Sequence, residues 1–178
     1  LVADLHSRGD KTDIECWLHS DGIDGGTSDF SDNYESLRHA SATSEPEITA
    51  VDDDLLYIMY TSGTTGLPKG VVHTHSTTIW ALITIMATAD MHEGDKYLAA
   101  LPMFHVGSLT PITLNVYSGT TSVVMREFDP VRAWELFEEE GITTALLVPA
   151  MLNFMIQVEG REKYDYSSVR WIQSGASP

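Results

Sequence analysis

The chain has 178 residues and a formal net charge of −16, because 26 Asp and Glu residues outnumber 10 Lys and Arg residues. This charge excludes nucleic-acid binding through a basic face and disfavours contact with anionic membranes. The length allows one ordinary domain with a hydrophobic core. No apolar run reaches the roughly 18 residues that cross a bilayer, so we expect no membrane span.

The acidic surplus has two interpretations. It can be a solvated surface that favours solubility, or it can mark a host with a salt-rich cytoplasm, where acidic surfaces are favoured and lysine is scarce. The only cysteine, Cys16, cannot form an internal disulfide and fits a reducing cytoplasm. No histidine motif accompanies Cys16, so we expect no catalytic role for its thiol.

Residues 1–53 are polar and acidic, and they predict a loop-rich leading segment of the same domain as the rest of the chain. Within this segment we expect loops at residues 21–28 and 41–46 and a short helix at residues 34–38. Residues 54–178 are expected to form the core segment.

Strands and helices alternate through this core segment, which indicates an α/β fold with right-handed crossovers and a mainly parallel sheet. The first strand is expected to be buried. We expect the first helix to pack through one apolar face that includes Ile79, Leu82, Ile83 and Met86. The predicted strands are residues 55–60, 71–72, 96–101, 120–125, 143–148 and 169–173, and the predicted helices are 75–89, 107–117, 130–140 and 149–158.

The segment from Tyr60 to Gly70 joins the first two predicted strands and is rich in glycine and hydroxyl side chains. Glycines let the backbone approach an anion, hydroxyls can donate to its oxygens, and Lys69 adds a mobile charge. The Walker pattern would require glycine at Pro68 and a hydroxyl after Lys69, so this is a different phosphate loop. A plain turn or linker is the alternative, which apolar strands on both sides disfavour.

Three further groups of residues are candidates for function. His105 follows an apolar strand, where a lone histidine is more often a packed side chain than a catalyst. His73 and His75 could form a metal pair, but no third ligand motif is visible, and entry into a helix is favoured. The run Ser174-Gly175-Ala176 is small enough for close approach to a ring, although an ordinary turn after a strand is the alternative.

The segment from Tyr60 to Val72 resembles the signature loop of the adenylate-forming enzymes, which include acyl-CoA synthetases, luciferases and the adenylation domains of peptide synthetases. Leu101 to Val106 resembles the second core motif of this superfamily, and Ser174 to Pro178 resembles its adenine-side motif. Phe104 to Val106 and Pro149 to Phe154 are most similar to fatty-acyl members. Family members are much longer, so we expect the chain to be a fragment.

The resemblance implies ATP-dependent activation of a carboxylic, most simply a fatty, acid to an acyl-adenylate, followed by thioester formation with coenzyme A. It implies that Lys69 and His105 serve catalysis, with His105 positioning the acid, and that Thr61 lies near Mg²⁺. A carboxylate is already ionised at neutral pH, so His105 has no proton to remove. By the same resemblance, the residues that contact ATP are Thr61, Ser62, Gly63, Thr64, Thr65, Gly66 and Lys69 at the phosphates, and Ser174, Gly175 and Ala176 at the adenine and acyl pocket.

Later family motifs do not occur in the chain, among them Tyr-Gly-x-Thr-Glu, whose glutamate helps to hold magnesium. We therefore expect that the chain alone does not complete adenylation. The alternatives are an aryl- or amino-acid adenylation domain and a non-catalytic module that binds a nucleotide or an acyl group. A reading frame that continues into Tyr-Gly-x-Thr-Glu would favour the enzyme.

Overall fold

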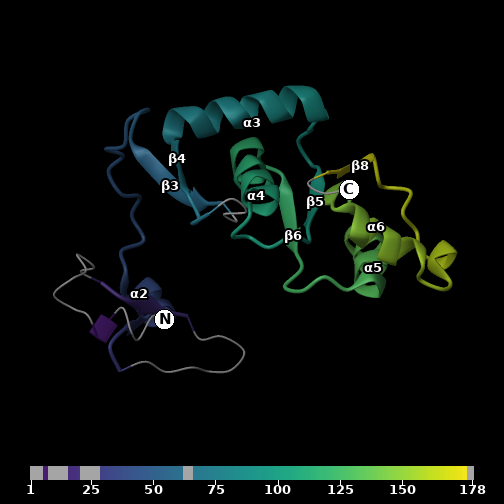
Figure 1. Cartoon of the computed structure of the whole chain (residues 1–178), viewed down its shortest axis with the longest axis horizontal. Coiled ribbons are helices and arrows are strands. Elements are labelled where there is room, and N and C mark those ends of the chain that lie inside the picture. Colours follow the sequence, from purple (N-terminus) through teal and green to yellow (C-terminus); the bar gives the residue numbers. More distant parts are fainter. Residues whose placement is uncertain (1–5, 8–15, 21–28, 62–65, 176–178) are drawn as a thin grey trace. The chain divides into compact units, whose positions relative to one another are not determined.

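The computed structural model describes residues 6–7, 16–20, 29–61 and 66–175, and Figure 1 shows their elements. The chain divides into two compact units, Leu1–Thr49 and Ala50–Pro178. That residues 1–53 belong to the same domain as the rest stays a prediction.

In the first unit, strand β1 (Leu18–His19) pairs in parallel with strand β2 (Asp32–Asn33). Helix α2 (Tyr34–Ala40) follows and confirms the short helix expected from the sequence. It begins after Asn33, whose Oδ1 accepts a hydrogen bond from the Ser36 N–H at 2.9 Å. The expected loop at residues 21–28 lies outside the described residues, and residues 41–46 belong to no helix or strand.

The second unit starts with strands β3 (Leu55–Tyr60) and β4 (Gly70–Thr74), which pair antiparallel. Both strands were predicted, but the prediction that the first is buried is wrong. The side chains of Leu55 and Ile58 are 56% and 48% exposed. Among the described strands β4 is the only partner of β3, so this hairpin is separate from the larger sheet of the unit.

Helix α3 (His75–Ala89) begins where the sequence predicted, because Thr74 and Thr77 form a capping box. This confirms that the His73–His75 segment leads into a helix. The expected apolar face is only partly buried. Leu82 is 1% exposed, whereas Ile79 and Ile83 are each 39% exposed.

The centre of this unit is a four-stranded, all-parallel sheet in the order β6-β5-β7-β8, which confirms the α/β fold. Strands β5, β6 and β7 are shorter than predicted by one or two residues at one or both ends, whereas β8 begins two residues later than predicted and ends one residue later. Their bounds are β5 (Lys96–Ala99), β6 (Thr121–Val124), β7 (Thr144–Leu147) and β8 (Trp171–Ser174). The remaining helices are α4 (Val106–Ser118), α5 (Pro130–Glu140), α6 (Pro149–Ile156) and the 3₁₀ turn η2 (Arg161–Lys163).

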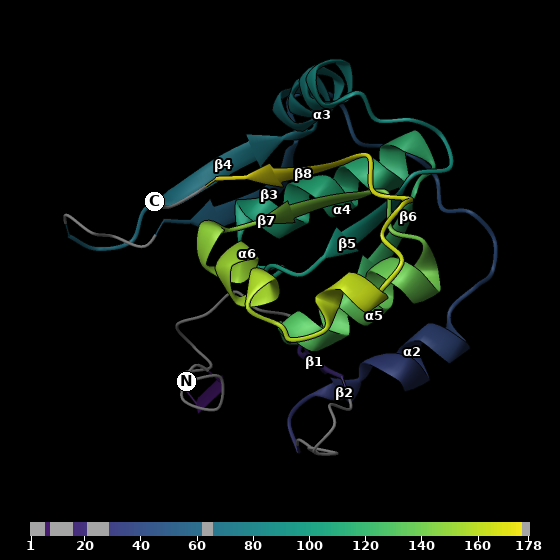
Figure 2. The same ribbon diagram turned by 90° about the vertical axis from the view of Figure 1, so that its right-hand side faces the viewer.

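Helices α5 and α6 cover one face of this sheet and α4 lies behind the other, as Figure 2 shows. Alternate residues of a strand point to opposite faces, so Leu98 and Ala100 join the core under α5 and α6. Phe137, 1% exposed, and Met155, 2% exposed, close that core from the helices. Across the described residues no helix is both long and apolar enough to traverse a bilayer.

An ion pair between Arg170 and Asp95 links the amino ends of strands β8 and β5. Arg170, directly before β8, donates through Nη1 to both carboxylate oxygens of Asp95 at 2.7 and 2.6 Å. The Thr143 hydroxyl and the His92 N–H donate to the same carboxylate, each at 2.7 Å. Burial alone would raise the pKa of Asp95, but these hydrogen bonds outweigh it and hold that pKa below its ordinary value. The network fixes β8 against β5 and β7.

Candidate functional site

The phosphate-type loop is closed at its base by two hydrogen bonds between Thr61 and Lys69. The Thr61 N–H donates to the Lys69 carbonyl at 2.9 Å, and the Lys69 N–H donates to Thr61 Oγ1 at 3.2 Å. Tyr60 and Gly70 are directly paired below them. A Cβ at Gly70 would lie 2.9 Å from Ile58 Cγ2, so glycine is required for this close pairing. The antiparallel hairpin therefore holds Thr61 and Lys69 side by side where β3 ends and β4 begins.

Four of the predicted phosphate-binding residues, Ser62, Gly63, Thr64 and Thr65, lie outside the described residues. Gly66 and Lys69 are described and exposed. Within the part of the chain that the structure describes, the Lys69 ammonium belongs to no ion pair, although acidic residues are abundant. No described carboxylate therefore competes with an external anion for the Lys69 ammonium.

His105 lies at the entrance to α4, at the end of the loop that leaves β5. Its N–H donates to the Pro102 carbonyl at 3.0 Å, and its own carbonyl accepts the N–H groups of Ser108 and Leu109, each at 3.0 Å. The backbone is therefore fixed while the residue itself stays exposed. The alternative of a packed histidine does not hold, and its positioning role stays a prediction.

Ser174 ends β8 and pairs with Leu147 at the end of β7. Because the sheet is parallel, Ser174 and Gly175 lie at the same sheet edge as the loop before His105. A Cβ added to Gly175 would meet no atom within 4 Å, so the space beside it is open. Ala176 lies outside the described residues.

A cavity of about 410 Å³ brings the base of the phosphate-type loop together with His105. We call it the nucleotide-side cavity. It lies between the hairpin and the start of α4. Its lining residues are Met59, Tyr60, Thr61, Val71, His73, His105 and Val106.

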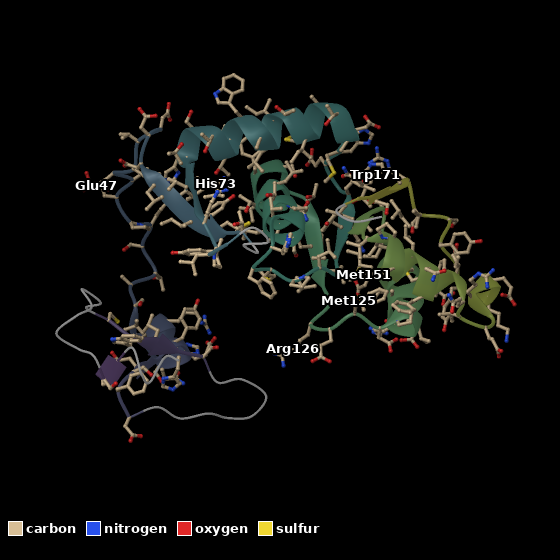
Figure 3. The ribbon with its side chains drawn as sticks, viewed as in Figure 1. Glu47, His73, Met125, Arg126, Met151 and Trp171 are labelled. Atoms are coloured by element: carbon tan, nitrogen blue, oxygen red, sulfur yellow. The ribbon has the colours of Figure 1, made fainter. Side chains whose placement is uncertain are left out.

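A second cavity of about 680 Å³ lies between α3, α4 and the strands β7 and β8, and we call it the apolar cavity. Ile85, Pro111 and Leu146 are among its apolar lining residues, and Trp171, labelled in Figure 3, lines it from β8. Val106, in the first turn of α4, is a wall residue of both cavities.

A resident metal centre is not visible among the described residues, where no three His, Cys, Asp or Glu side chains cluster. The predicted magnesium contact, Thr61, offers one hydroxyl oxygen. Mg²⁺ is commonly held by one or two protein oxygens together with substrate phosphates and water. The residues present therefore fit a magnesium ion that arrives with a nucleotide.

Sequence reasoning missed His73 as a residue of this site, having considered it only as part of a metal pair. The period-two alternation of β4 places Val71 and His73 on one face, which could have been noted. Which face looks towards His105 depends on the arrangement of hairpin and helix, and local sequence does not encode that.

The chain matches known proteins along nearly its whole length. The profile of the family described as AMP-binding enzyme matches residues 4–178. Over 144 residues the chain is 43% identical to the long-chain-fatty-acid–CoA ligase FadD13 of Mycobacterium tuberculosis, a match that covers 81% of the chain. It is 38% identical over 159 residues to 4-coumarate-CoA ligase 1 of Narcissus pseudonarcissus, again covering 81% of the chain. The chain spans 28% of the length of each of these two relatives.

Solved structures show the same fold. The inhibitor-bound N-terminal domain of FACL13 from Mycobacterium tuberculosis aligns with a TM-score of 0.78 and 35% identity, covering 99% of the chain and 43% of that domain. The o-succinylbenzoate coenzyme A synthetase of Bacillus subtilis, solved with ATP and a magnesium ion, aligns with a TM-score of 0.72 and 28% identity. That match covers 83% of the chain and 31% of the synthetase.

Proposed function

The chain belongs to the AMP-binding enzyme family, and we propose that it supplies the phosphate loop and part of the acyl and adenine pocket of an acyl-CoA synthetase. In the first step a carboxylate oxygen attacks the α-phosphorus of ATP, and pyrophosphate leaves. In the second step the sulfur of coenzyme A attacks the acyl carbonyl carbon, and AMP leaves with the electron pair of the broken C–O bond. The observation that carries this proposal is that Thr61 and His105 line one cavity, and that this cavity shares the lining residue Val106 with the apolar cavity.

In the proposed first step the loop neutralises the phosphates as pyrophosphate departs. Phosphoryl and adenylyl transfers depend mainly on positioning and charge stabilisation. The exposed Lys69 ammonium, without an ion-pair partner among the described residues, supplies the charge. Thr61, held at the base of the loop, contributes one oxygen towards the Mg²⁺ that accompanies ATP, and Ser62, Gly63, Thr64, Thr65 and Gly66 complete the phosphate contacts.

The acid is proposed to be a fatty acid whose carboxylate lies at His105 and whose tail enters the apolar cavity. The lining of this cavity is mostly apolar, which suits a hydrocarbon chain. The relative FadD13 is named for long-chain fatty acids, and the 4-coumarate ligase for an aryl acid. Ser174, Gly175 and Ala176 are proposed to border the adenine and the acyl group from β8.

Three further proposals accompany this function. Both compact units belong to one domain, which the extent of the family match over residues 4–178 supports. The protein resides in the cytoplasm, where the free thiol of Cys16 stays reduced. The chain by itself does not complete adenylation, because it spans only 28% of the length of the relatives compared above.

A chimera tests the proposed function. This chain replaces the matching segment of Mycobacterium tuberculosis FadD13, and fatty-acid-dependent exchange of pyrophosphate into ATP is measured. We expect exchange in the chimera and a fall of about 10²-fold with Lys69→Ala, because one charge stabilising the departing pyrophosphate is lost. Lys163→Ala, in η2, is the matched control and leaves exchange unchanged. Equal exchange by the chimera with and without the Lys69→Ala substitution would refute the phosphate role of the loop.

A further inference from the structure

Strand β4 places a second imidazole in the nucleotide-side cavity. Val71 and His73 project from the same face of β4, and both line this cavity together with His105. Figure 3 shows His73 on the side of β4 that faces α4. His73 lies beyond the motif that marks the loop, so the motif assigns it no role.

The ring of His73 is held in place by its neighbour across the hairpin. Tyr57 is paired directly with His73, and the two rings stack with centroids 4.6 Å apart and planes 22° apart. This contact holds the imidazole through one of its faces and leaves its nitrogens at the ring edge. Stacking therefore fixes the ring without consuming its hydrogen-bonding groups.

The ring nitrogens of His73 have no hydrogen-bond partner among the described residues, whereas other histidines do. His92, for example, bonds the Asp90 carboxylate through Nε2 at 3.0 Å. No Asp or Glu is among the described residues that line the nucleotide-side cavity. The imidazole of His73 thus lines a cavity whose described lining has no competing carboxylate and which Thr61, at the loop base, also lines.

We propose that His73 is a nucleotide-binding residue whose imidazole N–H donates a hydrogen bond to a phosphate oxygen held at the base of the loop. This inference rests on the proposed function and deepens it, because it adds a donor from β4 to those of the loop. The phosphate lies between His73 on one wall of the cavity and His105 on the other. The hairpin therefore contributes to the site with its strand as well as with its tip.

The Tyr57 stack makes a selective substitution possible. His73→Phe keeps an aromatic ring against Tyr57 and removes the N–H donor. His73→Gln restores an N–H donor without the ring. If His73 only packs against Tyr57, the Phe variant should bind pyrophosphate more tightly than the Gln variant. If His73 donates a hydrogen bond, the Gln variant should bind pyrophosphate more tightly than the Phe variant. His39→Phe, in α2 of the other unit, controls for the loss of one histidine.

The test follows the histidine C–H signals of the 178-residue chain by NMR at constant pH, with pyrophosphate and adenosine as separate probes. The His73 signal, identified by its absence from the Phe variant, shifts with pyrophosphate and stays in place with adenosine. His73→Phe weakens pyrophosphate binding about tenfold, as expected for one lost hydrogen bond to a charged group. His73→Gln recovers part of that loss, and His39→Phe binds as the unchanged chain does.

Two results would overturn the inference while the proposed function stands. In one, His73→Phe binds pyrophosphate unchanged whereas Lys69→Ala weakens it. In the other, adenosine alone shifts the His73 signal, which would assign the imidazole to the nucleobase. If pyrophosphate fails to bind, or binds equally to the unchanged chain and to Lys69→Ala, the proposed phosphate loop fails and the inference falls with it.

Discussion

Replacing Asp95 by Asn is expected to loosen the attachment of β8, the strand that ends at Ser174. The Asp95 carboxylate is 3% exposed and accepts hydrogen bonds from Arg170, Thr143 and the His92 N–H. An asparagine offers one acceptor oxygen, and its NH₂ group would face donors. The substitution therefore removes the charge of the pair and leaves donors unmatched.

The magnitude follows from this geometry. Hydrogen bonds to a charged group contribute roughly 1.5–3 kcal/mol, and breaking a fully buried pair costs more. The Arg170 side chain is 28% exposed, so water can partly solvate its guanidinium once Asp95 is replaced. We expect a loss of about 2 kcal/mol in the free energy of unfolding, at the lower end of this range.

Urea unfolding followed by tryptophan fluorescence measures this loss. For a urea slope of about 2 kcal/mol per M, the transition midpoint falls by about 1 M. Asp90→Asn is the matched control, since the Asp90 side chain is 77% exposed and the Arg170 Nη2 bond to the Asp90 carbonyl remains. A midpoint of Asp95→Asn equal to that of Asp90→Asn would refute the reasoning.

The pH dependence supplies a second check on the same pair. Because the folded-state pKa of Asp95 is lowered, its contribution is fully present above the unfolded pKa of about 3.9 and is lost as pH falls through the folded value. The difference in unfolding free energy between the unchanged chain and Asp95→Asn should thus be constant between about pH 5 and about pH 7 and shrink in more acidic solution. A difference that grows towards acid would contradict the assignment.

Three further outcomes are expected. Phe137→Ala, at a side chain 1% exposed, should lower the free energy of unfolding by about 3–4 kcal/mol in urea titrations. A loss under about 1 kcal/mol would show that packing under α5 contributes little to the stability of the chain. Gly107→Ala should change the thermal midpoint little, because the terminal Leu101 Cδ1, 2.9 Å from the new Cβ, can rotate away and alanine favours helix α4. A loss of stability above about 1 kcal/mol would show that the Leu101 side chain is held rigidly. If the net charge of −16 reflects adaptation to salt, the thermal midpoint rises with KCl into the molar range, and a midpoint that levels off once charges are screened would favour a merely solvated acidic surface.

The sequence predicted the bounds of a helix well where it contains residues that begin and end that helix. Asp129 caps α5 by accepting the Arg132 N–H at 2.7 Å, Pro130 opens the helix, and Gly141 ends it with a positive φ of 63°. Such residues act within a few positions of each other. The order of strands and helices, and hence the α/β fold, could be predicted from them.

Long-range contacts set the features that the sequence did not reveal. The partial exposure of β3 follows from which strands pair with it, and hydrophobicity alone suggested full burial. Asp95 and Arg170 are 75 residues apart, and nothing local indicates that they meet. The motif predicted Lys69 and His105 as site residues, but the orientation of His73 depends on how the hairpin faces α4.

Binding of nucleotide phosphates at the loop closed by Thr61 and Lys69 is tested most directly by titrating ATP with Mg²⁺ into the chain and measuring heat. We expect saturable binding that weakens roughly tenfold to a hundredfold in Lys69→Ala and is unchanged in Lys163→Ala, since only the first lysine lies at the loop. Equal binding by both variants, or binding that is insensitive to removing the phosphates from the ligand, would contradict this expectation.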